Sequence, residues 1–196
     1  MAAPALSRAR RWLPLLVGWL VGWLVGVVSA QDIPPAYEMA AQRAGVPASV
    51  LYALALQESG RRLHGRQVPW PWTLNVAGSP RRFNHRDAAC AALRQALRDV
   101  PPTRIDAGLG QINLGYQRHR YREPCELLDP YRNLAVAAAI LREQHAPGQN
   151  WLITVGRYHR PAGGAPAARY RQGVEQHLAR VLGVSGQGAQ RGDAPP

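Results

Sequence analysis

The stretch Leu51-Tyr-Ala-Leu-Ala-Leu-Gln-Glu-Ser-Gly60 decides how the rest of the chain is interpreted. Its apolar residues recur at helical spacing, and Leu51, Leu54 and Glu58 fall on one stripe of that helix. A carboxylate there loses hydration and is repelled by the negative end of the helix dipole, and both effects raise its pKa. Glu58 is therefore predicted to donate a proton near neutral pH, as the general acid of glycosidic cleavage must. A Glu that reaches solvent at a fraying helix end is the alternative that this stretch alone leaves open.

The first thirty residues differ from the rest of the chain. Three arginines precede an apolar run from Trp12 to Val28, and the small residues Ser29 and Ala30 follow. This pattern is typical of an export signal, so residues 1–30 are predicted to be a signal peptide cut before Gln31. The alternative is an uncleaved signal anchor, because the run is about as long as a bilayer span requires. The expected location is the periplasm, either free or anchored in the inner membrane.

The remaining residues suffice for one compact domain, predicted over 31–182. The tail 183–196 lacks apolar periodicity and is predicted to be disordered. The chain carries a net charge of +12, and all 24 basic residues are arginine. A strongly basic exported protein suggests an acidic polymer as its partner, either nucleic acid or an anionic envelope material.

The two cysteines, Cys90 and Cys125, both lie in the part predicted to be exported. An oxidising compartment makes one disulfide between them the favoured interpretation, and two separate buried thiols are the alternative. Two cysteines without clustered histidines do not make a metal site, so neither a metal nor another cofactor is expected.

The order of elements predicts a mainly α domain with one small β excursion. The tract Trp72-Thr-Leu-Asn-Val76 and Arg81-Arg-Phe83 flank Ala-Gly-Ser-Pro, which indicates a β-hairpin. Residues 61–68 show no clear periodicity. Helices are predicted from apolar spacing and from capping residues over about 34–44, 47–58, 85–98, 129–144, 150–158 and 167–182.

Four motifs in order extend the argument beyond Glu58. They are Glu58-Ser59-Gly60, then Gly108-Leu-Gly-Gln-Ile-Asn113, then Asn133, then Tyr158-His159. Together they resemble the lytic transglycosylase catalytic domain of the lysozyme-like superfamily, over about residues 33–182. The resemblance implies a lysozyme-like α+β fold with a small β-hairpin insertion. The tract Trp70-Pro-Trp-Thr-Leu-Asn-Val76 is similar to the insertion of members that accompany conjugation and type IV secretion machinery, whose components are thus possible partners.

The resemblance implies a reaction on peptidoglycan glycan strands. Glu58 would protonate the oxygen between N-acetylmuramic acid and N-acetylglucosamine, then take a proton from the muramic 6-hydroxyl, leaving a 1,6-anhydro end. The substrate's acetamido group would stabilise the intermediate. Ser59 would support the catalytic region and its contacts to the sugar, Gln111 and Asn113 would line the cleft, and Tyr158 would orient Glu58 by a hydrogen bond. Without the resemblance, Gln111 and Asn113 are loop-capping amides and Tyr158 is a core residue.

One position departs from the family pattern. The family most often has Met where this chain has Gly110, which puts a contact to the sugar there in doubt. Basic residues around the predicted cleft mouth are expected either to steer an acidic substrate or to form a solvated basic face: Arg61, Arg62, Arg66, Arg81 and Arg82.

Other functions remain as alternatives. A hydrolytic muramidase needs a second carboxylate, for which Asp106 is the best candidate. A binding module would hold peptidoglycan without cleaving it, but it has no need of a costly carboxylate on an apolar stripe. Nucleic-acid binding rests on charge alone, without an aromatic and basic platform or a recognisable reading helix, and is not expected.

Overall fold

The computed structural model describes residues 30–184, and these form a mixed α+β domain in which helices predominate. The predicted signal segment, except Ala30, and residues 185–196 of the predicted tail lie outside this range. None of the helices formed by the described residues has the length and apolar composition of a bilayer-crossing segment. The α-helices are α1 (Pro35–Ala44), α2 (Ala48–Ser59), α3 (Arg86–Asp99), α4 (Pro130–Glu143), α5 (Trp151–His159) and α6 (Gly164–Val181).

The six helices lie close to their predicted ranges. Local signals explain their ends: Gly45 takes the left-handed conformation after α1, with φ 68°, and Asp129 accepts a hydrogen bond from the Arg132 N–H at the start of α4. Asn150 caps α5 in the same way. The last helix begins at Gly164, three residues before its predicted start.

The strands form two antiparallel sheets, more than the single predicted hairpin. That hairpin is present as β3 (Thr73–Val76) and β4 (Ser79–Arg82). It is not an isolated insertion, because β3 also pairs with β5, giving a four-stranded sheet of order β4-β3-β5-β6. A second hairpin, which the sequence did not predict, forms a separate sheet. The remaining strands are β1 (Gly60–Leu63), β2 (Arg66–Pro69), β5 (Ile105–Ala107) and β6 (Ile112–Asn113).

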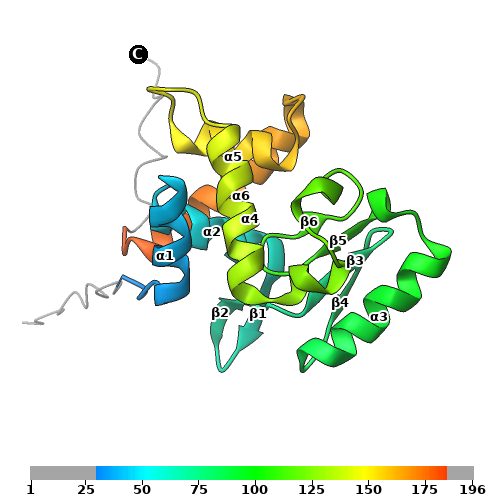
Figure 1. Ribbon diagram of the computed structural model, residues 1–196. Helices are drawn as coiled ribbons and strands as arrows, with labels where there is room; N and C mark the ends of the chain where they lie inside the picture. The colour runs from blue at the N-terminus through cyan, green and yellow to red at the C-terminus, as the bar shows by residue number, and fades with distance from the viewer. Residues whose placement is uncertain (1–29, 185–196) are drawn as a thin grey trace, which may run out of the picture.

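Helix α2 is the central element. Residues 50–56 are all buried, so the helix is covered on every side rather than along one stripe. Helices α1, α5 and α6 pack against it. In Figure 1 these helices and α4 make one side of the molecule, the helical lobe, while the four-stranded sheet and α3 make the other, the sheet lobe.

Three short 3₁₀ helices connect these parts: η1 (Pro102–Arg104), η2 (Arg118–Arg120) and η3 (Pro124–Leu128). A disulfide joins Cys90 of α3 to Cys125 of η3, with their Cα atoms 5.4 Å apart. The favoured interpretation of the two cysteines is thereby confirmed.

Candidate active site

A cavity of about 580 Å³ is lined by residues of both the helical lobe and the sheet lobe. The end of α2 contributes Glu58, and the end of α5 contributes Tyr158 and His159. Strands β3 and β5 and the segment that follows them form the opposite wall, with side chains that include Asp106, Gln111 and Asn113. The structure therefore brings the predicted residues together around one cavity, with the exception of Ser59.

Glu58 is held by a tyrosine of the last helix. The Tyr170 hydroxyl donates a hydrogen bond of 2.6 Å to Glu58 Oε1. No residue of the described chain hydrogen-bonds Oε2, and the Glu58 side chain lines the cavity. Burial raises the pKa of Glu58 to about 7; the Tyr170 hydrogen bond works against this rise, and the nearby charge of Asp106 adds to it. Glu58 can therefore both donate and accept a proton near neutral pH.

Tyr170 was missed as a functional residue in the sequence. It lies on the apolar face of α6 and is 8% exposed, so its position matched that of a core residue. A buried tyrosine hydroxyl needs a hydrogen-bond partner, and this requirement is the signal that could have identified it. His159 stacks on the Tyr170 ring, with centroids 4.4 Å apart and an angle of 3° between the rings.

Asp106 is the second carboxyl group of the cavity. Asn113 donates a 2.9 Å hydrogen bond to its Oδ1, and Asn75 donates a 3.3 Å bond to its Oδ2. Burial raises the pKa of Asp106, while these two hydrogen bonds oppose the rise. Because amide donors hold both of its oxygens, Asp106 is the better suited of the two carboxyl groups to remain ionised.

Two fully buried polar residues, Asn133 and Ser59, hold the loop between β5 and β6. Asn133 accepts a 2.8 Å hydrogen bond from the Gly110 N–H and donates to the carbonyls of Ala107 and Leu127. The Ser59 hydroxyl bonds the Leu109 carbonyl at 2.9 Å. Ser59 is 0% exposed and does not line the cavity. The Ser59 side chain therefore ties α2 to the loop, in keeping with a supporting part in this region and not with a direct contact to a ligand in the cavity.

Tyr158 lines the cavity with Glu58, but the hydrogen bond predicted between them is not formed. Its hydroxyl donates a 2.7 Å hydrogen bond to the Gly110 carbonyl and not to Glu58. A Cβ on Gly110 would lie 2.7 Å from Ala137 Cβ and 2.9 Å from Tyr158 Oη. The absence of a side chain at Gly110 thus accompanies the close approach of Tyr158, which occupies the space that a larger residue would need.

Gln111 and Asn113 line the cavity as predicted, but their amide groups already have partners. The Gln111 amide donates to the Gly108 carbonyl at 2.8 Å and to the Thr73 carbonyl at 3.2 Å. Asn113 Oδ1 accepts from the N–H groups of Gly115 and Tyr116. Both residues shape the wall, as their interpretation as loop-capping amides implies, and Asn113 in addition holds Asp106.

Three of the five arginines expected at the cleft mouth lie in different surroundings. Arg82 lines the cavity and donates to the Gly60 carbonyl at 2.9 Å. Arg61 lies over the Trp70 ring, 4.2 Å from its centroid. Arg66 lines a separate pocket that it shares with Arg180. These positions fit a solvated basic face better than a group of arginines that steers substrate into the cavity.

Comparison with protein-family models, curated proteins and solved structures finds no match to this chain. Residues 30–184 also contain no group of three or more His, Cys, Asp or Glu side chains placed to hold a metal ion.

Proposed function

We propose that this protein is a lytic transglycosylase with a lysozyme-like fold, which cleaves the bond between N-acetylmuramic acid and N-acetylglucosamine in peptidoglycan. One observation carries the proposal: Glu58 stands at the end of a buried helix, is held through one oxygen by Tyr170, and lines an open cavity. A pKa of about 7 suits a group that must give up a proton and later take one back.

In this mechanism, protonated Glu58 donates its proton to the glycosidic oxygen as the bond to the muramic anomeric carbon breaks. The substrate's acetamido oxygen stabilises that carbon. The Glu58 carboxylate then accepts the proton of the muramic 6-hydroxyl, whose oxygen bonds the anomeric carbon and closes the 1,6-anhydro ring. Glu58 ends the cycle protonated, ready for the next bond, so no water is consumed.

Hydrolysis by a muramidase is the second candidate, and Asp106 favours it. This carboxyl group lines the same cavity as Glu58 and is close enough for its charge to raise the pKa of Glu58. An ionised Asp106 could activate water or stabilise the positive charge that develops on the sugar. The two reactions differ in their products, because hydrolysis leaves reducing ends and transglycosylation leaves anhydro ends.

The predicted export signal and the Trp70–Val76 tract support a proposal for the biological setting. We propose that the enzyme acts in the periplasm and opens the wall locally for a conjugation or secretion channel. Strand β3, which belongs to this tract, forms part of the cavity wall through Thr73 and Asn75. The tract would thus contribute to the site itself, whatever apparatus recruits the enzyme.

The test is a digest of purified peptidoglycan with the protein and with its Glu58→Gln variant, with products identified by mass spectrometry. Anhydromuramyl products from the wild-type protein alone would support the proposal. Reducing ends would replace it with the muramidase, and Asp106→Asn would then also abolish activity. Wall binding without products, unchanged in Glu58→Gln, would indicate a binding module.

A further inference from the structure

Two residues at the rim of the cavity have no part in the mechanism above. Tyr116 and Gln117, here called the rim pair, follow β6 and line the cavity. Tyr116 is 73% exposed, the highest exposed fraction among the large hydrophobic side chains of the described residues. Its backbone is nevertheless fixed, since the Tyr116 N–H donates to Asn113 Oδ1 at 3.0 Å. An aromatic ring is thus held on a rigid backbone at the cavity mouth.

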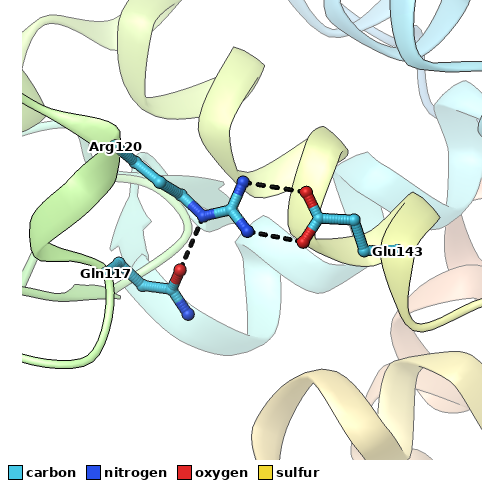
Figure 2. Close-up of polar contacts among 3 residues, drawn as sticks. All are labelled: Gln117, Arg120 and Glu143. Atoms are coloured by element: carbon cyan, nitrogen blue, oxygen red, sulfur yellow. Dashed lines mark hydrogen bonds and ion pairs between the residues drawn. The ribbon is translucent and has the colours of Figure 1, made fainter.

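The orientation of the Gln117 amide is determined by its neighbour. Arg120 Nε donates a 2.6 Å hydrogen bond to Gln117 Oε1. A guanidinium group has donors and no acceptor, so the amide oxygen must face Arg120 and the NH₂ group must face away from it. Figure 2 shows this arrangement. No hydrogen bond within residues 30–184 engages that NH₂ group, which therefore offers two donors at the rim.

Arg120 is itself held in place by α4. Its Nη1 donates to Glu143 Oε1 at 2.9 Å, and its Nη2 pairs with Oε2, so that the two planar groups meet in a fork (Figure 2). The Arg120 hydrogen bonds lower the pKa of Glu143, which keeps the carboxylate charged. The Arg120 carbonyl accepts a further bond from Arg132. This network attaches the segment that carries the rim pair to both ends of α4, through Arg132 in its first turn and Glu143 in its last.

We propose that the rim pair is a sugar-binding subsite, which takes one N-acetylated pyranose ring of the glycan beside the bond that is cleaved. The apolar face of the ring would stack on Tyr116, as flat apolar surfaces do on exposed aromatic side chains. The Gln117 NH₂ group would donate to an acetamido carbonyl or to a ring hydroxyl. Arg120 is a positioning residue, because it fixes the amide without lining the cavity itself.

The inference rests on the proposed function, since it names a subsite for the same glycan. It also separates two tasks: Glu58 performs the chemistry, and the rim pair supplies affinity. A rim residue that binds ground state and transition state equally should change KM and leave kcat alone. This split distinguishes a subsite from a residue that merely supports the fold.

The experiment measures binding of soluble, peptide-free glycan strands to the full chain by calorimetry, in a Glu58→Gln background that prevents turnover. Tyr116→Ala and Gln117→Ala are each expected to weaken binding about fivefold to tenfold, which corresponds to about 1 to 1.4 kcal/mol. Tyr116→Phe should bind as the parent does, because the stacking ring remains. Tyr131→Ala is the matched control: this tyrosine is also exposed, at 61%, but it lines a different groove.

In the active background, Tyr116→Ala and Arg120→Gln should raise KM several-fold at unchanged kcat. Parent-like binding by both Tyr116→Ala and Gln117→Ala would overturn the subsite while leaving the proposed function intact. Equal weakening by Tyr131→Ala would also overturn it, since the effect would not be local. If the Glu58→Gln parent binds no glycan and the wild-type protein releases no products, the proposed function itself fails.

Discussion

One face of α6 carries two buried polar side chains, Tyr170 and His177, in different surroundings. Tyr170 holds the Glu58 carboxyl group at the cavity. Seven residues further on, His177 is 7% exposed and lies against Arg180, whose Nη2 is 3.0 Å from His177 Nδ1. Between them, Gly173 permits a close approach, because a Cβ there would lie 2.5 Å from Gln57 Oε1. The same pair of helices thus builds two polar environments.

Burial moves the two titratable groups in opposite directions. It raises the pKa of Glu58 to about 7, and together with the Arg180 charge it lowers the pKa of His177 to about 4. Both groups are consequently neutral between these values. They differ in what remains free. Arg180 can only donate, so it occupies the Nδ1 lone pair of His177. Glu58 lines the cavity, and its Oε2 takes part in no hydrogen bond within residues 30–184. A perturbed pKa alone therefore does not mark the reactive group.

The largest expected effect is the loss of activity on replacing Glu58. Glu58→Gln removes the proton donor and should lower kcat about a thousandfold or more, as loss of a group that acts as both acid and base does. His177→Gln should leave kcat within about twofold. Product release from peptidoglycan, measured for both variants at equal protein concentration, checks this. Comparable losses in the two variants would show that α6 packing, and not Glu58, limits activity.

The second effect concerns stability. Below about pH 4.5, Glu58 is protonated whether folded or unfolded, so its burial costs little. Between about pH 4.5 and 7 the unfolded chain releases this proton while the folded protein keeps it. The free energy of unfolding therefore falls as pH rises through this range to the folded pKa of about 7. Glu58→Gln should therefore be more stable than the wild-type protein at pH 8, by on the order of 3 kcal/mol. Denaturant unfolding at pH 4 and pH 8 measures this, with a difference close to zero expected at pH 4.

A smaller effect is expected from Tyr170→Phe. Loss of the hydrogen bond should reduce kcat about tenfold, because Glu58 would no longer be held in one orientation. The same bond lowers the pKa of Glu58, so its loss should raise that pKa. The proposed reaction requires protonated Glu58, so the decline of activity above about pH 7 should move to higher pH in the variant. A pH profile of kcat that keeps its alkaline limb in place would contradict the assigned contact.

The smallest effect lies at the other end of α6. His177 stays neutral in the folded protein until about pH 4, whereas the unfolded imidazole takes up a proton near pH 6.5. Stability should therefore fall as pH drops from about 6.5 to 4. His177→Gln, which still offers an oxygen to Arg180, should reduce this loss by about 1 kcal/mol, since the pocket is open to water. Thermal melts across this pH range measure the difference.

The helices were predictable because they carry periodic apolar residues and strong end signals, such as Gly45 and the Asp129-Pro130 pair. The hairpin formed by β1 and β2 was not predictable. Its sequence does not alternate, and part of its support comes from distant contacts, such as the Arg82 bond to the Gly60 carbonyl. Strands β5 and β6 have only three and two residues, too few for any periodicity to appear.

The candidate site was predictable as a set of residues and less so as a set of contacts. Glu58 and its raised pKa followed from the helix, and the glycine-rich segment followed from its motif. The hydrogen-bond partner of Glu58 did not follow from the sequence, because Tyr170 is 112 positions away. Tyr158 belongs to one of the four motifs and was therefore the residue predicted. The burial of Ser59 did not follow either, because the Leu109 carbonyl that it bonds is brought to it only by the folded loop. Long-range pairing of this kind is set by packing, which local sequence does not reveal.

The disulfide has a topological consequence for the cavity. Cys90 and Cys125 close a covalent ring that contains Asp106, Gln111 and the rim pair. A protease that cuts the backbone once between residues 91 and 124 would leave two fragments that remain joined. One wall of the cavity can thus be nicked without being shed, while Glu58 and Tyr170 lie outside the ring on separate parts of the chain.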